Sequence, residues 1–410
     1  MNDTPAVAKT TRPPIPREIW VLVAAAFCVA IGFGLVSPIL PAYAHSFDVG
    51  VQAAAAIVSV FALMRLLFAP ASGQLIARLG ERRIYLTGIL IVALSTGACA
   101  LATGYWQLLL FRGLGGVGST MFTVSASALI VRLSPPTIRG RVSSLYGSGF
   151  LIGGILGPVL GTAMSGFGFR MPFVVYALTL LAAAGVVAAF LGEEALRPKP
   201  GTPALPVMTV REAWADNAYR ALMVSTFCHG WANFGLRVAL LPLFASTVPG
   251  MGVGWAGVAL TVFAVGNAVM LPLAGRLVDE IGRKPLVIGG LLVNGAATAV
   301  IGLSHSVIAL LVVSLLAGVG SGAIGPGQQA TVADIVGHDR NGGKVLAAFQ
   351  MSLDSGSIVG PVLAGLIADR YGFGWAFGVT AVLSVVAVIA WIPARESFPA
   401  RAARAAAEQP

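Results

Sequence analysis

The chain has 410 residues, of which 57% are hydrophobic and only 10% are charged. Soluble domains carry roughly a quarter charged residues, so this composition excludes a soluble globular fold and the soluble enzymes built on one. The net charge of +10 comes from basic residues scattered among loops, which argues against nucleic acid as a partner.

The apolar residues fall into blocks of about 20, the length that an α-helix needs to cross a hydrocarbon core about 30 Å thick. The blocks lack the period-two alternation of a membrane barrel, so we expect an all-α membrane protein. Charged loops and Gly/Pro residues divide it into twelve transmembrane helices. These helices are expected near residues 18–43, 51–76, 84–103, 106–131, 142–166, 171–192, 219–244, 254–276, 286–304, 306–330, 344–368 and 372–393.

A polar, proline-bearing segment divides the chain into two parts. We predict a tail at 1–17, a six-helix bundle at 18–192, a linker at 193–218, a second bundle at 219–393 and a tail at 394–410. Basic residues gather in every second loop, and positively charged flanks are retained in the cytoplasm. Both termini and the linker are therefore expected on the cytoplasmic side of the inner (plasma) membrane.

Short runs recur between the two bundles at nearly one offset. The Phe-Gly-Leu run at 33–35 recurs at 234–236, and the Gly-Pro-Val-Leu run at 157–160 recurs at 360–363. Because the matches keep their order, the second bundle is expected to repeat the first in parallel. Secondary transporters use this architecture and bind their substrate between the repeats.

Two loops at matching places share glycine and basic residues. Residues 73–83 read GQLIARLGERR, and residues 275–284 read GRLVDEIGRK. Glycine lets helix ends approach closely, so that basic side chains meet carboxylates or helix termini, and breaking these contacts favours the alternative conformer. Simple cytoplasmic anchoring is the alternative for the basic residues of the first loop. The gating candidates are Gly73, Arg78, Arg82, Arg83, Gly275, Asp279 and Arg283.

Two further motifs lie inside the predicted helices. Arg112 stands within the apolar run LLFRGLGG at 109–116, and glycines spaced by four at 149–157 precede a proline. This spacing strips one helical face of side chains, and the proline permits a bend. Generic small-residue packing is the alternative. The helix-bending candidates are Gly157, Pro158, Gly360 and Pro361.

These loops and motifs resemble the major facilitator superfamily, in particular its twelve-helix drug:proton antiporter branch. The resemblance covers nearly the whole chain outside the tails. It implies the major facilitator fold of two parallel-repeat six-helix bundles, a monomer, proton coupling through Arg112, and export rather than uptake. The family's first loop carries an aspartate where this chain has Ala77, so the charge relay is expected only in the second half, at Asp279.

Four ionisable groups other than histidine fall well inside the apolar blocks. They are Arg65, Arg112, Arg237 and Asp354. Each is costly in hydrocarbon unless it is paired or faces water, so these residues mark the working pathway. Asp354 is the predicted proton carrier, because an arginine stays charged. Arg65 and Asp354 both lie about 15 Å deep on helices that face each other in the fold that the chain resembles. We predict an ion pair that protonation of Asp354 releases, with a static latch as the alternative.

A polar stripe on the seventh helix is expected to face the substrate cavity. His229, Asn233 and Arg237 are spaced by four and share one helical face, although a lone histidine is more often a packing residue. Phe33 and Asn267 complete the predicted cavity, with a helix–helix hydrogen bond as the alternative for Asn267. Three arginines against one aspartate favour neutral amphiphiles or organic anions as substrates.

The sequence thus predicts a secondary active transporter that exports small amphiphilic, drug-like compounds in exchange for protons by alternating access. The alternatives are proton-coupled transport of a small organic anion or sugar, and a non-transporting membrane sensor. The chain carries no P-loop or HExxH motif, so we expect no enzyme, no catalytic residue, no metal site and no cofactor, with a proton gradient as the energy source. The expected partners are the lipid bilayer, a small-molecule substrate and protons.

Overall fold

The computed structural model describes residues 15–133, 139–191, 206, 208–248, 251–337, 340 and 342–398. Within these ranges the regular structure is helical, and eleven helices are long and apolar enough to cross a membrane. A twelfth crossing is built from three consecutive helical pieces. The prediction of an all-α protein with twelve spans is therefore confirmed.

The first half begins with a helix that is broken. We predicted one helix over 18–43, but α1 (Arg17–Val36) ends before Ser37 and the short α2 (Leu40–His45) follows. Pro38 explains the break, because it has no N–H for the helical ladder. The other helices of this half are α3 (Val51–Leu79), α4 (Glu81–Ala100), α5 (Tyr105–Leu133), α6 (Arg139–Ala163) and α7 (Met171–Phe190), with the short 3₁₀ turn η2 (Ser165–Phe167) before α7.

The second half contains a seventh crossing with a π-helical centre. The short α8 (Val210–Ala215) precedes it, and the crossing runs through α9 (Asn217–His229), the π-helix η4 (Gly230–Leu236) and α10 (Arg237–Thr247). Single π turns inside α-helices are frequent at functional sites. The remaining helices are α11 (Val253–Glu280), α12 (Arg283–Ile301), α13 (Val307–Val336), α14 (Gly343–Tyr371) and α15 (Phe373–Trp391).

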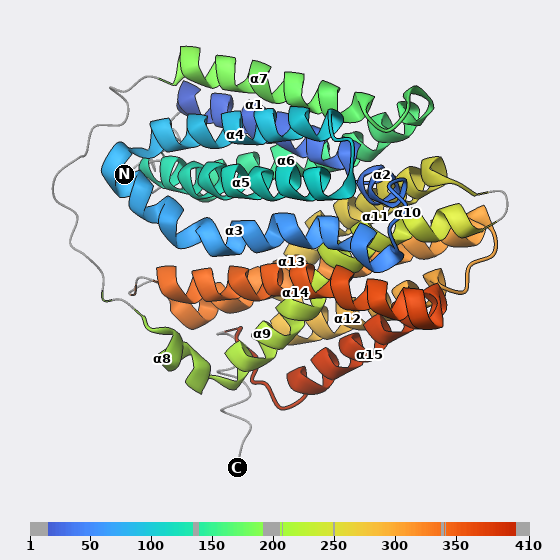
Figure 1. The fold of residues 1–410 in the computed structure, drawn as a ribbon. Helices are drawn as coiled ribbons and strands as arrows, with labels where there is room; N and C mark the ends of the chain where they lie inside the picture. Colours follow the sequence, from blue (N-terminus) through green and yellow to red (C-terminus); the bar gives the residue numbers. More distant parts are fainter. Residues whose placement is uncertain are drawn as a thin grey trace, which may run out of the picture.

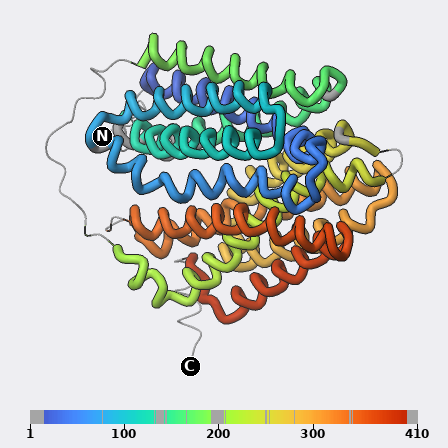
Figure 2. The backbone as a smooth tube through the Cα atoms, in the orientation of Figure 1, coloured from blue at the N-terminus to red at the C-terminus, as the bar shows by residue number. Residues whose placement is uncertain are grey.

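The two halves lie side by side, with the blue-to-green helices in one layer and the yellow-to-red helices in the other (Figure 1; Figure 2). Helix α3 packs along α14, and α6 packs against α11. We call the end of the molecule that holds the α3–α4 turn and α8 the linker end, and the end that holds the start of α3 the opposite end. The domain boundaries at 192/193 and 218/219 stay a prediction: residues 192–205 lie outside the described ranges, and at the second boundary α9 begins at Asn217.

Glycines bring helices of each half into close contact. A Cβ atom added at Gly157 of α6 would lie 2.6 Å from the Cα atom of Gly34 in α1, and one added at Gly360 of α14 would lie 3.1 Å from the carbonyl oxygen of Trp231 in η4. A larger residue at Gly157 would therefore push α6 away from α1. A proline follows each glycine inside its helix. Whether these prolines bend the helices during transport stays a prediction.

Candidate functional site

A cavity of about 690 Å³ lies between the two halves. Pockets for drug-sized molecules measure roughly 300–1,000 Å³, so this one suits a small ligand. All the residues that the sequence predicted for proton coupling and for the substrate cavity line it, namely Phe33, Arg65, Arg112, His229, Asn233, Arg237, Asn267 and Asp354. The structure thus brings these residues together from both halves, while their roles stay predictions.

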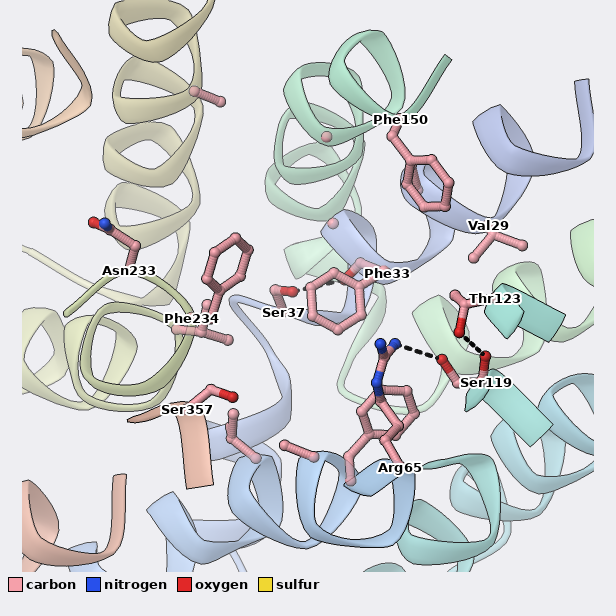
Figure 3. A pocket seen from close by; sticks show the side chains of 18 of the residues that line it. Val29, Phe33, Ser37, Arg65, Ser119, Thr123, Phe150, Asn233, Phe234 and Ser357 are labelled. Atoms are coloured by element: carbon pink, nitrogen blue, oxygen red, sulfur yellow. Dashed lines mark hydrogen bonds between the residues drawn. The ribbon is translucent and has the colours of Figure 1, made fainter. Parts of the chain in front are cut away.

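Aromatic side chains give the cavity a largely apolar wall. Figure 3 shows Phe33, Phe150 and Phe234 around the pocket, and Arg65 reaching into it from α3. His229 stacks on Phe234, with ring centroids 6.0 Å apart and planes 15° from parallel. An amphiphilic ligand with an apolar body fits such a wall better than a fully polar solute does.

Arg65 and Asp354 both line the cavity without touching each other. The Arg65 guanidinium donates to the Ser119 hydroxyl at 3.0 Å (Figure 3), and Asp354 accepts from the Gln350 amide at 3.4 Å. Among the residues that the structure describes, no ion pair joins Arg65 to Asp354. The predicted ion pair is therefore wrong for this conformation, because α3 aims the guanidinium at α5 of its own half.

Arg112 is a buried cation held by ring faces. Its side chain on α5 is buried, with the residue 6% exposed, and the guanidinium carbon lies 4.0 Å from the centroid of Phe61 and 5.9 Å from that of Phe33. Such cation–π contacts attract the charge but leave the N–H donors of the guanidinium without an acceptor. No hydrogen bond or ion pair joins Arg112 to another described residue, and its Nε atom is buried without a partner there.

Arg237 lies in a polar network instead. It is 1% exposed, donates to the Asn233 side-chain oxygen and to the Thr298 hydroxyl at 2.7 Å, and its guanidinium carbon lies 4.1 Å from the centroid of Phe263. Asn294 donates to the same Asn233 oxygen at 3.1 Å. The sequence analysis missed the two α12 members of this network. Their signal was two polar residues spaced by four inside an apolar helix.

Two amides of the second half join helices, and for Asn267 this agrees with the alternative interpretation, a helix–helix hydrogen bond. Asn267 of α11 donates to the Ser321 hydroxyl of α13 at 3.3 Å, and also lines the cavity. Gln328 of α13 donates to the Ser225 hydroxyl of α9 at 3.0 Å. These bonds fix the helices that form the second-half wall of the cavity.

The halves are joined toward the opposite end by a carboxylate that the sequence analysis missed. Asp369, near the end of α14, accepts hydrogen bonds from the backbone N–H groups of Val51 and Gln52 at 3.0 and 2.8 Å. It thereby caps the N-terminus of α3, where the helix dipole is positive. Farther along the same helices, the Ser59 hydroxyl donates to the Ile358 carbonyl at 2.7 Å. Together these bonds join α3 of the first half to α14 of the second at this end.

The predicted gating glycines at the linker end are not close to other helices. Within the described ranges, nothing lies within 4 Å of a Cβ atom added at Gly73 or Gly275. The close approach that we predicted at these glycines is therefore wrong for this conformation, in which the halves meet toward the opposite end. Arg78 and Arg83 are exposed.

Other basic residues of the two loops bind within their own half. Arg82 donates to the Ala188 carbonyl at 2.8 Å, and Arg283 forms an ion pair with Asp334 at 2.9 Å. Asp334 was not among the predicted residues. The Asp279 side chain lies outside the described part of the structure, so its gating role stays a prediction.

Comparison with known proteins adds a family. The sequence profile described as Major Facilitator Superfamily matches residues 22–258 and again residues 222–409. The chain is similar to Multidrug resistance protein 1 of Bacillus subtilis (strain 168), with 23% identity over 372 residues, which is 89% of this chain and 94% of that protein. It is also similar to Quinolone resistance protein NorA of Staphylococcus aureus, with 31% identity over 161 residues, which is 38% of this chain and 40% of that protein.

A solved structure shares the fold over most of both chains. It is a bacterial homologue of the human lysosomal transporter Spinster in an inward-facing and occupied conformation. The TM-score is 0.76, with 17% sequence identity, over 93% of this chain and 97% of that chain.

Proposed function

Since this chain belongs to the Major Facilitator Superfamily, we propose that it is an antiporter that exports small amphiphilic compounds in exchange for protons. Members of this family are transporters and not enzymes, so the chain is a multi-pass membrane transporter. The names of its relatives, a multidrug resistance protein and a quinolone resistance protein, support efflux as the direction.

The observation that carries proton coupling is the position of Asp354. Among the described residues that line the cavity, it is the one carboxylate. A coupled transporter needs a group in the transport pathway that binds and releases a proton, and the arginines of this cavity stay charged. Asp354 lies on α14, which packs along α3 of the other half, so its charge bears on the contact between the halves.

The distribution of contacts between the halves supports alternating access. In this conformation the halves are joined toward the opposite end by Asp369 and by Ser59. The basic loops lie at the linker end, which supports a cytoplasmic location for that end, for the linker at 193–218 and for both termini, in an inner membrane. In the other conformer, the linker end closes and Arg65 moves from Ser119 to unprotonated Asp354.

The cycle needs no cofactor and no second chain. The cavity is formed by the two halves of one chain, which supports a monomer as the working unit. Asp354 takes up a proton when the cavity opens to the outside, and releases it into the cytoplasm when the cavity opens there. The proton gradient is thus the energy source.

Transport by the Asp354→Asn protein tests this proposal. In liposomes with an imposed pH gradient, the wild-type protein is expected to move a fluorescent naphthalene amphiphile against the proton flux. The asparagine cannot titrate, so proton-driven movement should fall to the level of protein-free liposomes, while exchange of labelled for unlabelled compound persists. Full proton-driven transport by the variant would falsify the assignment.

Uptake of a small organic anion with protons is a second candidate, supported by the three arginines in the cavity. The same liposomes distinguish the two by direction, because import moves the compound along with the protons. A protein that moves no compound in either direction would instead fit a non-transporting sensor.

A further inference from the structure

The charges that line the cavity do not balance. The described lining residues include three arginines, Arg65, Arg112 and Arg237, and one carboxylate, Asp354. The carboxylate forms no ion pair with any of them within the described ranges. The lining of the cavity therefore carries an excess of positive charge that no described side chain neutralises.

The three arginines differ in how many of their donors are used. Arg65 donates to Ser119, and Arg237 donates to Asn233 and Thr298. Arg112 is buried as Arg237 is, and the Nε atom of each has no partner among the described residues, but the terminal nitrogens of Arg112 have ring contacts and no acceptor there. A buried guanidinium with free donors is unfavourable unless something supplies an anionic oxygen.

The surroundings of Arg112 limit the kind of ligand that can supply this anionic oxygen. Phe61 and Phe33 hold the guanidinium, and both also line the cavity, which continues along further aromatic side chains such as Phe150. A carboxylate or sulfonate alone would leave this apolar wall uncovered. A cationic ligand would be repelled by the excess positive charge, and Asp354 is the one carboxylate among the described lining residues that could pair with it.

We propose that the cavity binds amphiphilic organic anions, with the acid group on the guanidinium of Arg112 and the apolar body against the phenylalanines. The planar guanidinium offers paired N–H donors that match the two oxygens of a carboxylate. The ring faces of Phe61 and Phe33 hold the guanidinium without using those donors. That this anion is the exported compound rests on the proposed function, whereas its binding does not.

The test is binding of a matched series to purified full-length protein by isothermal titration calorimetry. The probes are 2-naphthoate, the neutral 2-naphthamide and the cationic 2-naphthylmethylammonium, which share one apolar body. Wild-type protein is expected to bind 2-naphthoate at least about 10-fold more tightly than 2-naphthamide, since a buried charged hydrogen-bonded pair is at stake. Equal affinities, or a preference for the ammonium, overturn the proposal.

Variants of Arg112 assign the preference to this residue. In Arg112→Gln the ratio of the two affinities is expected to fall to about one, with 2-naphthamide binding retained as evidence of folding. Arg112→Lys keeps the charge but lacks the paired donors, so its ratio should lie between the two. Arg340→Gln is the control, because Arg340 is an exposed partner of Glu212 outside the cavity, and its ratio should equal that of the wild type.

Each outcome separates this inference from the proposed function. If Arg112→Gln keeps the wild-type ratio of 2-naphthoate to 2-naphthamide affinity, Arg112 is not the anchor. If that variant does not fold, the wild-type ratio in Arg112→Lys leads to the same conclusion. Preferential 2-naphthoate binding without pH-driven transport supports the anion site and contradicts the antiporter. Proton-driven export of 2-naphthamide by a protein without anion preference supports the antiporter and contradicts the anion site.

Discussion

The two halves of the molecule place a buried arginine on the same kind of support and then treat it differently. Arg112 lies over Phe61 of α3, and Arg237 lies over Phe263 of α11. The two phenylalanines are separated by 202 residues, the offset that relates the loops at 73 and 275, so they are equivalent positions of the repeat. In the second half the two terminal nitrogens of the guanidinium donate to Asn233 and Thr298, and in the first half no described residue accepts from them; the Nε atom is buried without a partner in both.

This difference separates a structural charge from a functional one. A buried cation whose donors are bonded by its own helices contributes to the stability of those helices. One without acceptors costs free energy in the empty protein and recovers it when an anion binds. Arg237 thus connects the π-helical seventh crossing to α12 by hydrogen bonds, whereas Arg112 is the proposed anchor for a bound anion. Both arginines line one cavity, so substitutions can tell the two roles apart.

Replacement of each arginine by leucine should give the largest contrast. Arg237→Leu leaves the buried Thr298 hydroxyl without its charged donor and the Asn233 oxygen with Asn294 alone, and a buried group left unsatisfied costs about 1–3 kcal/mol. The free energy of unfolding should fall accordingly. Arg112→Leu leaves no acceptor unsatisfied and removes a buried unpaired charge, so stability should stay equal or rise while export is lost. Thermal melting of the two purified variants, compared with the wild type, measures this; equal destabilisation by both would contradict the contrast.

The two ring supports should show the same contrast at a smaller scale. A cation–π contact in a desolvated site is worth about 0.5–2 kcal/mol. Phe61→Leu should therefore weaken 2-naphthoate binding by about 2- to 30-fold, because the ring no longer positions the guanidinium. Phe263→Leu should lower stability by a similar free energy, with less effect on the affinity ratio of the probes. Calorimetric titration measures the affinities of both variants and thermal melting measures their stabilities, and each variant serves as the control for the other.

Much of this arrangement was readable from the sequence. The spans follow from blocks of apolar residues, and the repeat follows from runs at nearly one offset, because both depend on local composition. All the predicted coupling and cavity residues line one cavity, since a charge or a polar stripe in a membrane helix has few other places to lie. The break after α1 was also visible, in Pro38.

The partners of these residues were not readable. Depth along a helix suggested that Arg65 would meet Asp354, but the rotation of α3 aims the guanidinium at Ser119. The π-helix η4 packs closely on α14, which is distant in the sequence: a Cβ atom added at Gly235 would lie 2.9 Å from the Cδ atom of Pro361. The cap by Asp369 left no signal because its partners are backbone N–H groups, which every residue except proline carries.

A substitution at the start of α3 should have a smaller effect. Helix α3 carries Phe61, and its N-terminus is bonded to Asp369 of the second half. Asp369→Ala removes the carboxylate that caps the N-terminus of α3, and such a cap is worth about 0.5–2 kcal/mol. The population should shift toward the conformer that is open at the opposite end. A spin-label pair across α3 and α14 at that end should report longer distances, and Asp216→Ala, which removes a cap from α9 within one half, should leave them unchanged.

The smallest effect is expected from a substitution that removes one acceptor from Arg237, so that its guanidinium resembles that of Arg112. Thr298→Val has nearly the same shape but removes the hydroxyl that accepts from Arg237, so stability should fall by about 0.5–1.5 kcal/mol. Arg237 lines the cavity and then has a donor without an acceptor, so the ratio of 2-naphthoate to 2-naphthamide affinity should rise about threefold. Thr331→Val is the matched control, because the buried Thr331 hydroxyl donates only to the Gly327 carbonyl of its own helix. If Thr298→Val and Thr331→Val gave the same ratio, satisfaction of the donors would not be what distinguishes the two arginines, and the difference between the halves would need another cause.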